Sequence, residues 1–408
     1  MTAQRTSRVG VALAIAAVVT LCAWYFGFRS TAVDLGAAQW FVVGPSGRVI
    51  GVGRPDGSLG LIDLDGQALG VLSVGAATDS LVLGRDDTAF VVEGGTEGTQ
   101  RYVARMARSA SAITTSRVDV PAGSRLVPVV DGAKARGGLE RDATRMLLAV
   151  RGAADGGERV EGLRWLDLAT LATTPVPLAF DGEIARAVTA MPGQGGFALL
   201  CVPSSGATSS TPARLRVFDA AGAPLYVVED VAPVLPYWLP ETGTLLFERA
   251  AGGISRFHPP DGKPVWVCDG RFTDAVARGY VAARDLQEAW VLVEKADGDG
   301  YVQVAQIWPF ESGARRTRNL TTGLVHKFGL AVSFDHRFVA FRQVDGKLEG
   351  GAVDERVVLV DQSASYRSST VIDRKVEPKA TDIGPEFPAS EDVVLYIDDN
   401  RLHKLIVD

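Results

Sequence analysis

A ten-residue phrase recurs along this chain about eight times, roughly once every 40 to 56 residues. Each copy joins an apolar stub, a short polar turn and a run of β-forming residues. A second β-run that ends near an aspartate follows, and then a turn and a third run. Each unit therefore predicts four short strands. Clear copies lie at 43–52, 238–247, 332–341 and 387–396, and weaker copies start near Leu83, Leu139, Met191 and Ala283.

Four-stranded units at this period predict an all-β fold in which the units form a ring, that is, a β-propeller. A linear stack of repeats would need polar caps at both ends, whereas here the last unit stops after its third strand, at 402–407. In a ring, an N-terminal segment can supply the missing strand, so that no sheet edge stays unpaired. Residues 31–35 are the expected closing strand. The count favours eight blades, with seven as the alternative.

One junction between units is similar to that of a known family. Residues 319–323 read Asn-Leu-Thr-Thr-Gly and lead to Val-Ser-Phe-Asp-His-Arg-Phe-Val-Ala-Phe at 332–341. This stretch resembles the blade junction of TolB-like and WD-repeat-like propellers, whose repeat reads roughly L-T-x-G and then W-S-P-D-G-K-x-I-A-F. His336 replaces the turn glycine of that pattern, and the leading tryptophan survives only as Trp238. The resemblance spans about 300 residues and implies an architecture rather than an activity.

Residues 9–28 contain no charged side chain and are long enough to cross a bilayer as a helix. Arg5 and Arg8 precede this segment, so the positive-inside rule places the N-terminus in the cytoplasm and the rest outside. A cleaved signal peptide and lipidation at Cys22 are the alternatives, and both also export the chain. The expected organisation is a cytoplasmic stub (1–8), a signal-anchor helix (9–28), a linker with the closing strand (29–37) and a periplasmic or extracellular propeller (38–408).

The sequence predicts no catalytic set, metal or cofactor. The net charge is −6 and no Lys/Arg block stands out, which argues against a nucleic-acid partner. The histidines lie in different units without ligand spacing, and the Asp-Gly repeat at 296–300 lacks further calcium ligands. Cys201 and Cys268 fall in apolar β-runs and are predicted to be buried thiols, with a disulfide as the alternative. The four histidines are His258, His326, His336 and His403.

The expected binding surface is the set of connections between second and third strands. They are mostly long, at 93–99, 152–161, 203–212, 296–300 and 344–355, and in a meander all emerge on one face of the ring. Their acidic residues would favour basic or neutral partners. Trp238 is expected in the core between blades, and Tyr237, on the opposite strand face, is expected to be exposed. The candidate partner-binding residues are Glu97, Asp155, Glu158, Asp297, Asp299, Asp345, Glu349, Asp354 and Tyr237.

These features favour a membrane-anchored module of the cell envelope that binds a protein or peptide through the long-loop face. The first alternative is a propeller enzyme, a hydrolase or lyase acting on sugars or lactones, with residues gathered in the central funnel. The second alternative is a protein that binds a small ligand.

Overall fold

The computed structural model describes residues 32–407, apart from short internal gaps. Within these ranges the chain is built from β-strands, and no helix there is long and apolar enough to cross a membrane. The expected signal anchor at 9–28 lies outside the described residues. The gaps are 74–77, 85–87, 95–100, 109–112, 128–129, 132–133, 136–142, 155–156, 181, 192–195, 205–210, 235, 240–241, 252, 260–264, 269–274, 283–287, 296–301, 309–315, 322–324, 334, 346–352, 364–366, 377–383 and 389–392.

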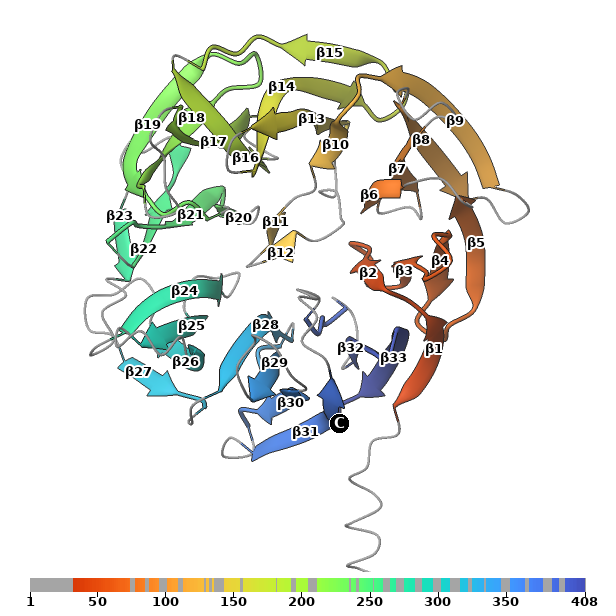
Figure 1. The fold of residues 1–408 in the computed structure, drawn as a ribbon, viewed down its shortest axis with the longest axis vertical. Coiled ribbons are helices and arrows are strands. Elements are labelled where there is room, and N and C mark those ends of the chain that lie inside the picture. The colour runs from red at the N-terminus through yellow and green to blue at the C-terminus, as the bar shows by residue number, and fades with distance from the viewer. Residues whose placement is uncertain are drawn as a thin grey trace, which may run out of the picture.

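The sheets stand side by side in a ring, as a propeller requires (Figure 1). Five of them are four-stranded antiparallel meanders in which each strand pairs with its neighbour in the sequence. Their strands are β2 (Trp40–Val43), β3 (Val49–Gly53), β4 (Leu59–Asp63) and β5 (Ala68–Ser73); β6 (Thr78–Leu83), β7 (Ala89–Gly94), β8 (Arg101–Arg108) and β9 (Ile113–Val120); β20 (Tyr237–Leu239), β21 (Thr244–Glu248), β22 (Ile254–Phe257) and β23 (Val265–Cys268); β24 (Ala275–Ala282), β25 (Ala289–Lys295), β26 (Val302–Trp308) and β27 (Arg316–Asn319); β28 (His326–Val332), β29 (Phe338–Asp345), β30 (Val353–Asp361) and β31 (Arg367–Val376).

A sixth sheet has eight strands and contains two successive meanders. A single residue pair, Val160 with Ala185, joins the third strand of one meander to the first strand of the next. The ladders inside each meander are much longer, so the junction is a local contact between two units. Their strands are β10 (Ser124–Val127), β13 (Arg145–Ala154), β14 (Gly157–Asp167) and β15 (Thr173–Val176), then β16 (Glu183–Met191), β17 (Gly196–Pro203), β18 (Ala213–Phe218) and β19 (Pro224–Val231).

The chain's first and last strands share one sheet. In it, β1 (Val33–Ala37) pairs with β33 (Arg401–Ile406), which pairs with β32 (Val393–Asp398). Strand β1 overlaps the closing strand predicted at 31–35 and pairs with the last strand of the chain, as that prediction requires. The red and blue ends of the ribbon consequently meet in Figure 1. A bridge from Glu386 to Leu395 extends the sheet on its inner side.

A two-stranded hairpin lies within the ring rather than on its circumference. It consists of β11 (Val130–Asp131) and β12 (Lys134–Ala135), in the connection between β10 and β13. In the view of Figure 1 it falls near the middle of the ring, and its first strand contacts β20.

The apolar core is divided into clusters that lie between neighbouring sheets. One cluster joins Leu61 of β4 to Leu81 of β6, and another joins Phe341 of β29 to Trp290 of β25. Because each sheet packs on both faces, whole strands are buried, as in β17, where every residue but the last is buried. Trp238 is fully buried in such a cluster, which confirms its predicted place between blades.

A two-residue turn at Asp399 and Asn400 connects the last two strands. Both residues have positive φ, at 48° and 56°, as a type I′ hairpin turn requires. We expect Asn400→Val to lower the free energy of unfolding by about 1–2 kcal/mol, because a β-branched residue is strained at this φ. Asn400→Gly should leave it nearly unchanged, and thermal unfolding of the two variants checks the difference.

An ion pair joins the first strand to the last. Arg401 donates from both Nε and Nη2 to Asp34 Oδ2, each at 2.6 Å. This hydrogen bond is the main reason that the pKa of Asp34 lies below its usual value. The stabilisation is therefore present above the ordinary pKa of about 3.9 and is lost as the pH falls through the lowered value in the folded state. We expect Asp34→Asn to unfold at a lower temperature than the wild type at pH 7, and the gap to close toward pH 2.

Candidate functional site

The ring has two rims of different character. We call one the turn rim, because it carries the turns between first and second strands and between third and fourth strands. The other is the loop rim, which carries the connections between second and third strands. Since both faces of each sheet are packed, the rims and the outermost strands are the surfaces left for a partner.

The turn rim uses aspartates to close its own turns. Asp63 Oδ1 accepts hydrogen bonds from the backbone N–H groups of Asp65 and Gln67, at 2.9 and 2.8 Å. Asp219 and Asp167 hold the equivalent turns of other units in the same way. Side-chain acceptors of this kind replace backbone partners in a turn. The aspartate that recurs at the end of the third strand is therefore structural.

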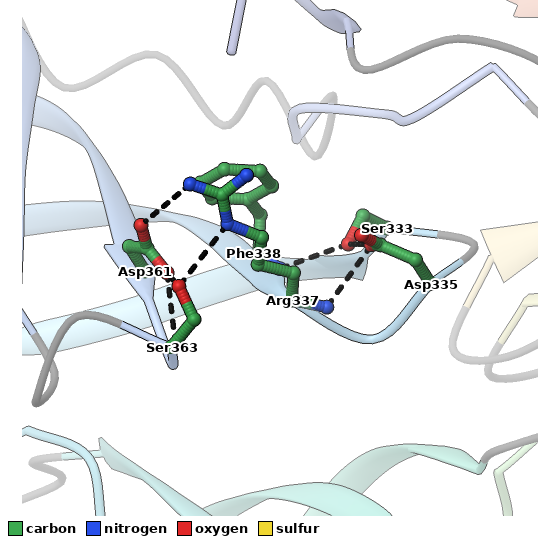
Figure 2. A network of polar contacts seen from close by, with 6 residues as sticks. All are labelled: Ser333, Asp335, Arg337, Phe338, Asp361 and Ser363. Atoms are coloured by element: carbon green, nitrogen blue, oxygen red, sulfur yellow. Dashed lines mark hydrogen bonds and ion pairs between the residues drawn. The ribbon is translucent and has the colours of Figure 1, made fainter. Parts of the chain in front are cut away.

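Figure 2 shows how two turns of one sheet are locked together. Ser333 Oγ donates to Asp335 Oδ1 at 2.6 Å, within the turn between β28 and β29. Arg337, from the same turn, reaches Asp361 Oδ2 and Ser363 Oγ, both at 3.2 Å, in the turn between β30 and β31. These polar groups bind one another, so the side chains of these two turns serve to hold the turns in place.

His336 belongs to the same turn and contacts the neighbouring sheet. Its φ of 61° is the left-handed conformation for which the family pattern uses glycine. Its Nδ1 lies 3.1 Å from Glu288 Oε1, and its ring centroid is 5.3 Å from that of Trp290. Gln362 donates to the His336 carbonyl oxygen and accepts from Trp290 Nε1. The histidine thus joins two sheets, and its turn position is as predicted.

The structure describes only some of the predicted partner-binding residues. Asp345 and Asp354 pair across β29 and β30 at the loop rim, although the Asp345 side chain is not described. Glu158 lies in β14 and is exposed. The other loop residues of the set, namely Glu97, Asp155, Asp297, Asp299 and Glu349, lie outside the described residues.

The prediction that Tyr237 is exposed is wrong, because only 2% of its surface is accessible to solvent. The prediction assumed that residues on the two faces of a strand differ in exposure. In this ring β20 is packed on both faces, so Tyr237 and Trp238 are both buried. The Tyr237 ring instead lies 6.0 Å from that of Tyr280, on the first strand of the next sheet.

The prediction of a long loop at 152–161 is also wrong. Strands β13 and β14 continue through it and pair as far as Ala154 with Gly157. Its polar residues are therefore strand residues of a hairpin that projects at the loop rim. The ladder shifts register after Val150, and a bulge of this kind increases the local twist.

Arginines surround Glu158 on this part of the loop rim. Arg151 donates to Glu158 Oε2 at 3.1 Å, and Arg125 lies 4.0 Å from Oε1. Arg186, a bulge residue on the first strand of the next unit, donates to the Glu158 carbonyl oxygen at 3.2 Å. Three arginines thus contact Glu158 here, and Glu161 pairs with Arg159 on the same strand. These residues come from separate strands, so no local motif identifies them.

A second arginine group lies beside the first, on β16 and β18. Glu183, whose side chain is 11% exposed, accepts hydrogen bonds from Arg214 and Arg216 at 3.1 and 3.4 Å. Cys201 lies beneath this group as a free thiol with no exposed surface. Burial, and then the charge of Glu183, raises the pKa of the thiol to about 12. Cys201 is therefore the buried thiol that was predicted, whereas the side chain of Cys268 is not described.

Tyr280 carries a buried hydroxyl that has no hydrogen-bond partner among the described residues. Burial, and then the nearby charge of Glu248, raises the pKa of Tyr280 well above its usual value. Because an unpaired buried hydroxyl costs about 1–3 kcal/mol, we expect Tyr280→Phe to leave the free energy of unfolding unchanged or slightly higher. Tyr280→Ala, measured alongside it by chemical denaturation, should lower that free energy by about 3–5 kcal/mol. A large loss for phenylalanine would show that the hydroxyl is bonded.

Among the described residues, no group of three or more His, Cys, Asp or Glu side chains is placed to hold a metal ion. No protein-family model matches the chain, and no curated protein matches it either. Comparison with known proteins therefore rests on solved structures.

Solved propellers do match the chain at the level of the fold. The WD40 domain of SCAP from fission yeast matches with a TM-score of 0.54 and 11% identity, over 92% of this chain and 97% of that one. The dihydro-heme d1 dehydrogenase NirN, in complex with DHE, matches with a TM-score of 0.54 and 14% identity, over 83% of this chain and 67% of that one.

A putative TolB from Agrobacterium tumefaciens also matches, with 14% identity over 72% of this chain and 94% of that one, but its TM-score of 0.38 adds no argument. At these identities the matches show the fold alone, and 547 solved chains share it, so the fold selects no activity. The predicted resemblance to WD-repeat propellers is confirmed as one of architecture.

Proposed function

We propose that the chain is an eight-bladed propeller that serves as a protein- or peptide-binding module. The blade count is supported by the five separate meanders, the two meanders within the eight-stranded sheet, and the closing sheet of β32, β33 and β1. The Glu386 bridge supplies the inner strand of that last blade. Eight units of this kind agree with the eight copies of the repeat phrase.

The observation that carries the binding role is the contrast between the two rims. On the turn rim, side chains such as Asp63, Asp219 and Ser333 are engaged by their own turns. On the loop rim, Glu158 and Arg159 are exposed on paired strands and bond to the side chains of Arg151 and Glu161 rather than to the backbone of a turn. A rigid scaffold that presents charged groups at one rim suits the recognition of another protein.

We place the module outside the cytoplasmic membrane, held by a helix at 9–28. The support is the uncharged length of this segment and the arginines at 5 and 8 that precede it. A phosphatase that is active only outside the cytoplasm, fused after Asp408, should be active in intact cells. A control fusion in which residues 9–28 are replaced by a polar sequence should be inactive. If the fusion with the intact segment were equally inactive, the result would contradict this location.

The binding role is tested by photocrosslinking in cells from single positions on the two rims. A photoreactive residue at Arg159 or Asp354 samples the loop rim, whereas one at Arg48 or Ala221 samples the turn rim. We expect a discrete crosslinked protein from the loop-rim positions and none from the turn-rim positions. Equal products from both rims, or products only from the turn rim, would contradict the proposal.

A further inference from the structure

One corner of the ring lies where the chain enters its first strand. Counted outward from the Glu386 bridge, β32 and β33 are the second and third strands of their sheet, so the 399–400 turn lies on the loop rim. Strand β1 runs antiparallel to β33, and its first residue, Val33, lies opposite Lys404 at the far end from this turn. Lys404 Nζ donates to Asp65 Oδ1 at 3.0 Å, in the turn between β4 and β5 on the turn rim. The chain therefore enters the ring at the turn rim.

Two aliphatic side chains are exposed at this corner. Val33 is 43% exposed and Ile406 is 50% exposed. Ile406 lies two residues beyond Lys404, the partner of Val33, so both aliphatic side chains project from the same face of the sheet. Diagonal neighbours of this kind lie about 7–8 Å apart, close enough to form one apolar contact surface. We call Val33 and Ile406, with Lys404 between them, the closing corner.

The closing corner is tied closely to the uncharged segment at 9–28. Residues 29–32 are all that separate this segment from Val33. The peptide steps from residue 28 to residue 33, at most about 3.6 Å each, span about 18 Å. The polar layer on each side of a bilayer is about 5–8 Å thick. With 9–28 across the membrane, Val33 would lie within the headgroup layer or within about 13 Å of it, whatever the path of the connecting residues.

We propose that the closing corner rests on the lipid bilayer, with Val33 and Ile406 among the headgroups. This inference rests on the proposed function, because it requires the anchor, and it adds the orientation of the ring. Aliphatic side chains gain free energy when they leave water, and the short tether keeps them at a high effective concentration beside the lipid. Because the closing corner is at the turn rim, this contact keeps the loop rim clear of the bilayer and accessible to a partner.

The test uses the full chain in liposomes that contain a radiolabelled phosphatidylglycerol, with a photoreactive residue at position 67 or 159. Gln67 is exposed in the β4–β5 turn beside the closing corner, and Arg159 is exposed on the loop rim. We expect a lipid adduct from position 67 and none from position 159. Because the contact is apolar, the yield of the adduct should not fall when the salt concentration is raised.

Paired variants test the two aliphatic side chains. Val33→Ser/Ile406→Ser should lower the yield of the lipid adduct at position 67 at least about threefold, because docking no longer buries two aliphatic side chains. Val33→Leu/Ile406→Leu should keep the wild-type yield. The control Leu225→Ser/Val227→Ser changes side chains that are 47% and 53% exposed on the outer strand β19, and should also keep it. All of these side chains are exposed, so the variants should unfold at the wild-type temperature.

Equal yields from the two serine variants, or equal lipid adducts from positions 67 and 159, would overturn the proposal. An adduct between two copies of the chain at position 67, in place of the lipid adduct, would also overturn it. Liposomes that float without the chain would remove the anchor and this inference together, whereas a chain that floats with them but gives no lipid adduct at position 67 would remove this inference alone. Lipid adducts without any loop-rim crosslink in cells would leave the orientation standing and remove the binding role.

Discussion

Replacing Arg342 by methionine is expected to lower the free energy of unfolding by about 3–5 kcal/mol, because it leaves a buried carboxylate without its partner. Arg342 and Glu355 face each other across β29 and β30, with 2% and 6% of their surfaces exposed. Arg342 Nε lies 3.1 Å from Glu355 Oε1, and the guanidinium also donates to the Ile397 carbonyl oxygen of the next sheet at 2.9 Å. Chemical denaturation at pH 7 measures the loss.

The double variant Arg342→Met/Glu355→Leu separates the cost of an unpaired charge from the value of the pair. We expect it to recover most of the stability, since a buried pair often contributes little beyond the apolar residues that could replace it. Arg159→Met removes an arginine from the exposed pair with Glu161 and should cause a much smaller loss. A double variant as unstable as the single one would mean that the Ile397 contact, not the charge, is decisive.

Replacing residues 33–37 by a Gly/Ser sequence is expected to lower the free energy of unfolding by at least about 3 kcal/mol. The change takes Leu35, 7% exposed, out of the cluster that joins the first and last sheets. It also leaves the backbone of β33 without a neighbour, which exposes an unpaired edge. We further expect a broader thermal transition, because the last sheet would no longer be held by the first.

Val33→Ser is the matched control for the closing strand. Val33 is 43% exposed, so its replacement keeps the strand and alters only a surface side chain. Its unfolding temperature should stay close to that of the wild type. If the Gly/Ser variant also unfolded like the wild type, β1 would not hold the ring together.

The repeat phrase predicted the architecture because each sheet of a propeller is formed by strands that follow one another in the sequence. Each polar turn, such as Ser333–His336, is fixed by nearby side chains, and each third strand ends in an aspartate that closes the next turn. Ring closure was also predictable, since a unit with three strands needs a fourth from elsewhere. Both the turn-forming residues and the number of strands in each unit can be recognised in a single sequence.

The contacts of Arg125, Arg151 and Arg186 with Glu158 and the burial of Tyr237 were not predictable, for the same reason. Tyr237 follows the alternation of a strand, but alternation indicates exposure only where one sheet face is solvated, and here neighbouring sheets cover both. Arg125, Arg151 and Arg186 lie on three different strands, and Arg186 reaches Glu158 only because the ring places the next unit beside it. Contacts between units depend on the geometry of the ring. The positions of single arginines in the sequence do not predict these contacts.

The pairing of β1 with β33 sets the order in which a nascent chain can mature. The ribosome synthesises β1 (Val33–Ala37) more than 360 residues before its partner strand β33 (Arg401–Ile406). At typical elongation speeds of about 5–20 residues per second, the first strand waits roughly 20 to 70 seconds for its partner. A chain that terminates prematurely would therefore form an incomplete ring with an unpaired sheet edge at each end. Such edges would bind chaperones or pair with another incomplete ring.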